Sequence, residues 1–172
     1  MAGRLAGKRA VVVGAGSSGP GWGNGKASAA LFAREGASVL CVDVNGEAAQ
    51  ETADLIAGEG NTAKPFTADV SKSDAVEAMV AEAVGLWGGL DILHNNVGIG
   101  QGDTGPVHLT EETWDRITGV NMKSVLFMCK HVLPVMREQG GGVITNISSV
   151  AAIASTGLVA LSLIHISEPT RQ

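Results

Sequence analysis

A strand, a glycine-rich turn, a helix and a second strand follow one another between Arg9 and Asp43. The β-branched run RAVVV stops at Gly14, glycines recur as far as Gly25, and an apolar helical pattern and the apolar run SVLCVD follow. A turn without side chains lets backbone N–H groups approach a phosphate, and the start of a helix adds the positive end of its dipole. An acidic residue after the second strand suits a ribose hydroxyl pair and repels a 2′-phosphate. This segment therefore predicts a dinucleotide site.

The glycine turn alone is a weak signal, because glycine-rich turns are common. Gly16, Gly19 and Gly21 are equally compatible with a plain loop. A P-loop does not fit, because Pro20 stands where that motif needs its first glycine and Ala27 has no hydroxyl for Mg²⁺. Hydrolysis of a nucleoside triphosphate is therefore not expected.

Length and charge favour one globular domain of a cytoplasmic protein. The chain has 172 residues, enough for a core, and its net charge of −5 argues against a nucleic-acid surface. No apolar stretch reaches the ~18–20 residues of a membrane span, and the N-terminus lacks the apolar core of a signal peptide. Cys41 and Cys129 have no metal-type spacing and are predicted to be buried structural thiols, so no metal site is expected.

The rest of the chain alternates helical and strand patterns. Helices are predicted over 45–60, with Asn45 as a cap, over 71–88, opened by Ser71 or Ser73, and over 111–139; strands are predicted within 61–70, 90–98 and 141–150. This order predicts an α/β fold with a doubly wound parallel sheet, the Rossmann fold. Ligands bind such sheets at the carboxyl ends of the strands. The residues predicted at those ends, and so expected to form a single site, are Gly14, Asp43, Asp69, Asn95 and Ser149.

Four segments together resemble the short-chain dehydrogenase/reductase family over residues 5 to about 160. They are KASAALFAREGA, DILHNNVG, VNMKSVLFMCKHVLPVM and GGVITNISSVAA. DILHNNVG looks like the family's N-N-A-G motif, and the last two segments carry its Asn and its Ser. The resemblance implies an oxidoreductase with an NAD(P)-binding Rossmann domain.

The resemblance also implies roles for particular residues. Asn121 would hold a water in a proton relay, Ser149 would hydrogen-bond the substrate oxygen, and Asn95 would brace the central strand. The remaining positions would contact the cofactor, Asp69 and Val70 at its adenine ring: Gly14, Gly23, Gly25, Asp43, Asp69, Val70, Asn96, Val97 and Gly98.

Several of these residues have a plainer interpretation that the sequence leaves open. Asp69 is also compatible with a helix cap, and the Asn95–Asn96 pair and the Ser148–Ser149 pair with simple turns. His94 is predicted to be a core histidine, and the remaining candidates, His108 and His131, to be surface residues. Eight residues separate Gly14 from Gly23, where the family has three, so the segment SSGPGW contains an insertion. Trp22 within it is predicted either to lie over the cofactor or the active-site mouth, or to belong to a surface loop.

The C-terminal end departs from the family pattern. The family's catalytic Tyr would fall at Leu161 or Ser162 and its Lys at His165 or Ile166, and the chain contains no tyrosine. LSLIHISEPTR is the in-frame translation of a transposon-end adapter used in sequencing libraries. The expectation is therefore an incomplete Rossmann domain over 1–160, lacking its C-terminal strands and helices, and an artefactual tail over 161–172.

The sequence thus predicts a fragment of an oxidoreductase that transfers a hydride between NAD(H) and a small alcohol or carbonyl substrate. The fragment itself is expected to be inactive, and the parent protein to be a homo-oligomer that uses the helix from about Glu111 in its dimer contact. Two alternatives stay open: a non-catalytic dinucleotide-binding module and an S-adenosylmethionine-dependent methyltransferase.

Overall fold

One parallel sheet organises the molecule. The computed structural model describes residues 3–149 and residue 160. Five strands pair in the order β3-β2-β1-β4-β5, all in parallel. Their bounds are β1 Arg9–Val13, β2 Ser38–Asp43, β3 Ala63–Thr67, β4 Ile92–Asn95 and β5 Val143–Asn146. The predicted doubly wound parallel sheet is confirmed.

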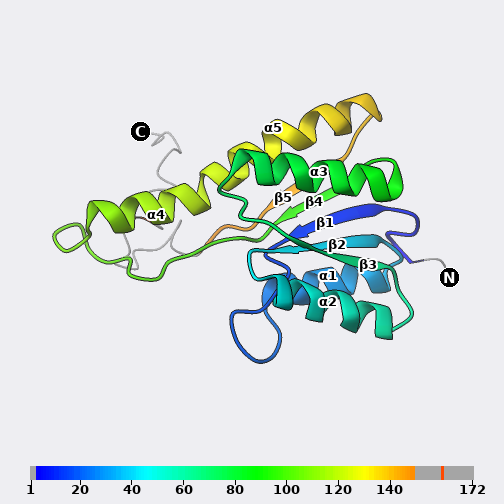
Figure 1. Ribbon diagram of the computed structural model, residues 1–172, viewed down its shortest axis with the longest axis horizontal. Helices are drawn as coiled ribbons and strands as arrows, with labels where there is room; N and C mark the ends of the chain where they lie inside the picture. The colour runs from blue at the N-terminus through cyan, green and yellow to red at the C-terminus, as the bar shows by residue number, and fades with distance from the viewer. Residues whose placement is uncertain (1–2, 150–159, 161–172) are drawn as a thin grey trace, which may run out of the picture.

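Helices cover both faces of the sheet (Figure 1). α1 (Asn24–Arg34) and α2 (Gly46–Gly58) lie on one face, and α3 (Ser73–Trp87) and α5 (Lys123–Glu138) lie on the other. Alternate side chains of a strand point to opposite faces. Val11 and Val13 of β1 accordingly belong to the core beneath α3 and α5, whereas Ala10 and Val12 belong to the core beneath α1 and α2.

The helix predicted over 111–139 is divided in two. α4 (Glu111–Asn121) projects beyond the sheet, and α5 begins at Lys123 (Figure 1). Met122 between them keeps right-handed backbone angles, with φ −99° and ψ −48°. Asn121 turns its side-chain amide onto the backbone of Ile99, in the loop that follows β4. The division between the two helices thus coincides with a contact between Asn121 and a segment outside them.

The helix starts agree with the sequence in part. Asn45 caps α2, because its side-chain oxygen accepts hydrogen bonds from the backbone N–H groups of Glu47 and Ala48 at 3.1 and 3.4 Å. α3 begins at Ser73, but its N-cap is Lys72, which makes no side-chain capping bond. The segment predicted to be an artefactual tail, residues 161–172, lies outside the described residues.

Candidate functional site

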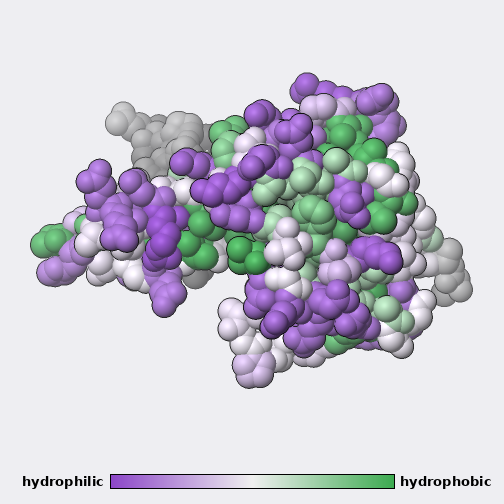
Figure 2. Space-filling view, in the orientation of Figure 1, coloured by the Kyte–Doolittle hydropathy of each residue, from purple (hydrophilic) through white to green (hydrophobic). Residues whose placement is uncertain are grey.

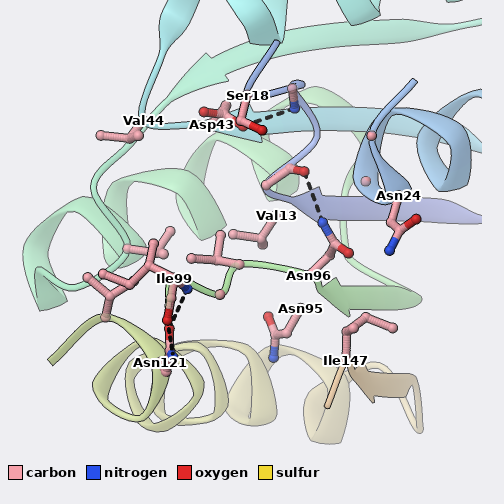
Figure 3. Close-up of a pocket in the computed structure, with 18 of the residues that line it drawn as sticks. Val13, Ser18, Asn24, Asp43, Val44, Asn95, Asn96, Ile99, Asn121 and Ile147 are labelled. Carbon is pink, nitrogen blue, oxygen red and sulfur yellow. Dashed lines mark hydrogen bonds between the residues drawn. The ribbon is translucent and has the colours of Figure 1, made fainter. Parts of the chain in front are cut away.

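A cavity of about 1010 Å³ lies at the carboxyl ends of the strands (Figure 3). The loops after β1, β2, β3, β4 and β5 all contribute to its wall, as parallel-sheet topology predicts. All the residues predicted to bind cofactor or to take part in catalysis line it: Gly14, Gly23, Gly25, Asp43, Asp69, Val70, Asn96, Val97, Gly98, Asn121 and Ser149. The structure therefore brings the predicted site residues together, and their individual roles stay predictions.

The glycine turn is closed by backbone contacts that leave no room for side chains. Gly14 has φ +72°, a left-handed angle that favours glycine, and its N–H donates to the carbonyl of Val42 at 2.8 Å. A Cβ on Gly25 would overlap the carbonyl oxygen of Gly14 and lie 2.7 Å from Nδ2 of Asn96. The start of α1 is thus held directly against the end of β1.

The three glycines left open by the sequence have different environments. A Cβ on Gly16 would lie 2.6 Å from Cβ of Ala48 and 2.8 Å from Oδ2 of Asp43, so this position needs a glycine. A Cβ on Gly19 would meet nothing within 4 Å. Gly21 also has open space around it, but its φ of +107° favours glycine. Gly19 is therefore a plain loop residue, whereas Gly16 belongs to the turn.

The Asp43 carboxylate is fixed between the glycine turn and α2 (Figure 3). Its Oδ2 accepts a hydrogen bond from the backbone N–H of Gly16 at 2.9 Å, and its Oδ1 accepts one from the N–H of Asn45 at 3.0 Å. An ionised carboxylate offers about four acceptor positions, so capacity remains for hydroxyl donors in the cavity. The geometry suits the ribose role predicted for Asp43.

Asp69 organises the loop before α3. Its Oδ1 accepts hydrogen bonds from the backbone N–H of Ser71 at 3.0 Å and from the Ser71 hydroxyl at 2.6 Å. The hydroxyl bond is the main cause that holds the pKa of Asp69 below its usual value. Because Lys72 is the N-cap of α3, Asp69 is not a simple helix cap. Val70 beside it is buried.

The two asparagines that end β4 make cross-strand bonds. Nδ2 of Asn96 donates to the carbonyl of Gly14 at 3.1 Å, and Nδ2 of Asn95 donates to Oδ1 of Asn146 at 2.8 Å. The backbone N–H of Ile147 donates to the carbonyl of Asn95 at 2.9 Å. These bonds tie β1, β4 and β5 together at the cavity, which agrees with a bracing role for Asn95. Its Oδ1 is buried and has no hydrogen-bond partner among the residues that the structure describes.

The Asn121 side chain bonds to the loop after β4 (Figure 3). Its Oδ1 accepts from the N–H of Ile99 at 2.8 Å, and its Nδ2 donates to the carbonyl of Ile99 at 2.9 Å. One N–H of Nδ2 and one lone pair of Oδ1 remain for further partners. The residue closes the wall of the cavity opposite the glycine turn.

Both serines after β5 lie along the cavity wall. Ser148 is exposed and Ser149 is half-buried. The position alone does not rank the two hydroxyl groups. The assignment of Ser149 to the substrate oxygen stays a prediction.

Two residues whose hydroxyl groups support the glycine turn are not identified by the sequence patterns. Ser17 donates from Oγ to the carbonyl of Gly21 at 3.1 Å and accepts from the N–H of Gly23 at 2.9 Å, which fastens the neck of the inserted loop. Thr52 of α2 is fully buried and donates to the carbonyl of Ala15 at 2.8 Å. A hydroxyl within a glycine turn is a usable signal for Ser17. Nothing in the helical pattern around Thr52 marks its contact.

Trp22 follows the second of its two predicted alternatives. Its side chain is 58% exposed and does not line the cavity. Instead, Nζ of Lys26 lies 5.8 Å from a Trp22 ring centroid, and Cζ of Arg34 lies 6.0 Å from one. These distances are typical of cation–π contacts. The inserted segment is therefore a surface loop that rests on α1.

The histidines fulfil the predictions in part. His94 is buried, its Nδ1 lies 2.7 Å from Oγ1 of Thr145, and burial lowers its pKa. His108 is exposed, as predicted. His131 is half-buried rather than exposed, and its Nε2 lies 2.9 Å from Oγ of Ser73. The prediction that it is a surface residue is therefore only partly correct.

The cysteines show no sign of metal binding. Cys41 is buried as predicted, and burial raises the pKa of its thiol to about 12, whereas Cys129 is only half-buried. Among the described residues, no group of three or more His, Cys, Asp or Glu side chains is placed to hold a metal ion. None of the helices in this part of the chain is long and apolar enough to cross a membrane.

Comparisons with known proteins agree with this geometry. Residues 8–161 match the family model described as short chain dehydrogenase. An uncharacterized oxidoreductase of Bacillus subtilis, YxbG, is 38% identical over 154 residues, which cover 89% of this chain and 54% of that protein. The chain thus spans about half the length of the curated relatives it matches.

Two solved structures are similar in sequence and in fold. A short-chain dehydrogenase/reductase from Burkholderia xenovorans is 45% identical with a TM-score of 0.91, and the match covers 96% of this chain and 66% of that one. A 7α-hydroxysteroid dehydrogenase complexed with NADH and 7-oxo glycochenodeoxycholic acid is 33% identical with a TM-score of 0.85, with coverage of 94% and 61%.

Proposed function

The chain belongs to the short-chain dehydrogenase family, and we propose that it is part of an NAD(H)-dependent oxidoreductase that interconverts a small alcohol and its carbonyl compound. Oxidoreductase family membership leaves the methyltransferase alternative without support. We further propose that residues 1–160 form an incomplete domain and that 161–172 are an artefactual tail. The parent protein is proposed to be a cytoplasmic homo-oligomer.

The position of Asp43 carries the choice of NAD(H). Its carboxylate lines the cavity and is held by Gly16 and Asn45. A 2′-phosphate placed beside this carboxylate would be repelled, since two like charges meet with little water between them. No Lys or Arg side chain lines the cavity in the part of the chain that the structure describes. Nothing there would compensate the repulsion.

The residues present fit a dinucleotide. Gly14, Gly23 and Gly25 carry no side chains into the cavity, so a phosphate can approach the backbone at the start of α1. Asp43 would accept hydrogen bonds from ribose hydroxyls, and Asp69 and Val70 would contact the adenine. When bound, the nicotinamide ring supplies the hydride chemistry. The protein binds and orients the ring and handles the proton.

The proton chemistry is only partly represented in the printed chain. Ser149 is proposed to hydrogen-bond the reacting oxygen, and Asn121 to hold a water in the proton relay. The Tyr and Lys that the family uses as acid/base and as its tuning partner are absent from the sequence. The 172-residue chain is therefore proposed to be a dinucleotide-binding module without an acid/base group.

A fluorescence titration of the purified chain with NADH and with NADPH tests the proposal. We expect NADH to bind more tightly than NADPH. Asp43→Asn removes the charge but keeps the size of the side chain, and should reduce the ratio of the two dissociation constants by ~10-fold, or about 1.4 kcal/mol. Asp54→Asn is the matched control, because Asp54 is an exposed residue of α2 that bonds to Gln50 outside the cavity. Tighter binding of NADPH by the unmutated chain, or equal effects of the two substitutions, would show that Asp43 does not select the cofactor.

A further inference from the structure

The inserted segment forms a loop that leaves the cavity wall and returns to it. Ser17 and Ser18 line the cavity, and the wall resumes at Gly23. Residues 19–22 between them do not line it. Figure 1 shows the loop in blue on the side of the sheet that α1 and α2 cover, and Figure 2 shows it as a pale projection at the lower edge of the molecule. The loop therefore has its two ends in the cavity wall and its tip outside.

The Ser17 hydroxyl closes the neck of this loop. It donates to the carbonyl of Gly21 at 3.1 Å and accepts from the backbone N–H of Gly23 at 2.9 Å. Because Gly23 is the N-cap of α1, the same hydroxyl joins the loop to the start of that helix. The position of Ser17 on the cavity wall thus depends on the path of the chain through residues 19–22.

Trp22 holds the outer part of the loop on α1. Its indole lies over the Lys26 ammonium and the Arg34 guanidinium, at 5.8 and 6.0 Å from a ring centroid. Lys26 is paired with Glu51 of α2 at 2.5 Å. Arg34 is paired with Glu59, the C-cap of α2, at 2.8 Å. The ring therefore rests on two cations that are held in place by a neighbouring helix.

The rest of the loop contributes little to fixing its shape. A Cβ on Gly19 or on Gly21 would meet nothing within 4 Å. Glycine also has more conformational freedom to lose on ordering than any other residue. Trp22 is the one large side chain of the segment SSGPGW. Its contact with α1 is therefore the main restraint on the tip of the loop.

We propose that Trp22 is a positioning residue for the cofactor phosphates: its contact with Lys26 and Arg34 anchors the inserted loop, and the anchored loop holds Ser17 beside the start of α1. The inference rests on the proposed function, which places the phosphates there, and deepens it. Apparent affinity falls with the fraction of molecules whose site is formed. Without the anchor, the loop would lose conformational freedom each time the phosphates bind.

Ligand-observed NMR titrations of the full 172-residue chain with ADP and with adenosine test the proposal. The two probes share the nucleoside and differ in the diphosphate. Trp22 is 58% exposed, so the fold should tolerate its replacement. Trp22→Leu should weaken ADP binding ~3–10-fold, the order expected when exposed cation–π contacts are lost, and leave adenosine binding unchanged. Unchanged ADP affinity in Trp22→Leu, or an equal loss of adenosine affinity, would overturn the proposal.

Two further variants distinguish the aromatic anchor from a general effect on the loop. Trp22→Phe keeps an aromatic ring and should retain most of the ADP affinity. Gly19→Ala is the matched control in the same loop, because its Cβ meets nothing within 4 Å, and it should not weaken ADP binding. A loss in Trp22→Phe as large as in Trp22→Leu, or an equal loss in Gly19→Ala, would contradict the anchoring role.

A double-mutant cycle locates the effect in the contact with α1. Arg34→Met removes one cation outside the cavity and should weaken ADP binding less than Trp22→Leu does, because Lys26 remains. The ion pair lost with Glu59 is common to both sides of the cycle. The double variant should bind ADP no more weakly than Trp22→Leu alone. Fully additive losses would show that Trp22 and Arg34 act independently, against the proposal.

The cofactor titration separates this inference from the proposed function. Failure of both NADH and ADP to bind the unmutated chain would contradict the proposed function and this inference with it. Normal NADH binding by the unmutated chain, combined with unchanged ADP affinity in Trp22→Leu, would contradict only the role of Trp22.

Discussion

The β1–β2–β3 end of the sheet and the β4–β5 end form their parts of the cavity wall differently. At the first end, β1 and β2 are buried and the edge strand β3 is partly exposed, and Asp43 in the wall accepts hydrogen bonds from the backbone N–H groups of Gly16 and Asn45. At the second end, β4 is mostly buried, Ile144 is the half-buried residue of the otherwise exposed edge strand β5, and Asn146 of β5 accepts a hydrogen bond from the side chain of Asn95 in β4. Backbone donors therefore fix the wall at the first end, whereas side chains of two adjacent strands fix it at the second. In the proposed function, the first end binds the adenosine half of the cofactor and the second end carries the reaction.

The largest expected effect concerns turnover at the β4–β5 end. We expect the chain as printed to have no dehydrogenase activity, because a general acid/base is worth ~10²–10⁴ in rate and the chain contains no tyrosine. The measurement is NADH formation or consumption, followed by its absorbance, with a panel of alcohols and ketones. Weak NADH binding without turnover would agree with a first end that binds the cofactor and a second end that lacks its acid/base group. Turnover of any of these compounds by the purified chain would break it.

The second effect concerns the two serines after β5. In the protein encoded by the genomic reading frame beyond Ala160, Ser149→Ala should lower kcat by ~10²-fold or more, since an oriented polar contact to the reacting oxygen is lost. Ser148→Ala is the matched control and should have a mild effect. Steady-state kinetics and NADH affinity are measured for both. If Ser148→Ala lowers kcat more, the assignment of Ser149 is wrong.

The smallest effect concerns packing at the glycine turn. Gly25→Ala should destabilise the chain by about 1–3 kcal/mol and weaken NADH binding, because its Cβ would overlap the carbonyl oxygen of Gly14. Gly19→Ala is the control, since a Cβ there meets nothing within 4 Å. Urea unfolding and NADH titration read out both variants. Equal stability and affinity of the two would mean that the close contact of α1 with β1 is unimportant.

Local patterns made most of the fold predictable. The β-branched run before Gly14, the apolar helical spacing after Gly25 and the Asn45 cap each depend on neighbours in sequence, and the structure agrees with them. The strand ends then follow from parallel topology, so the candidate site was predictable as a set of residues. The necessity of Gly16 was not, because it depends on Ala48, a residue of the following helix.

Contacts between distant segments account for what the sequence did not reveal. The division between α4 and α5 coincides with the bonds from Asn121 to Ile99, and the half-buried position of His131 goes with its contact to Ser73. Thr52 supports the glycine turn from α2 through a bond that no local pattern marks. Such contacts depend on packing, and a single sequence read by periodicity does not contain them.

Hydrogen–deuterium exchange of the backbone amides, with and without NADH, tests the central claim most directly: that the cavity at the carboxyl ends of the strands is a dinucleotide site. We expect NADH to slow exchange in segments 14–18, 23–25, 43–45, 68–71 and 96–99, which contribute to the cavity wall. Exchange around Gln139, which bonds to Leu90 at the opposite end of the sheet, should not change. Protection confined to other segments, or no protection at NADH concentrations that saturate the fluorescence signal, would contradict the claim.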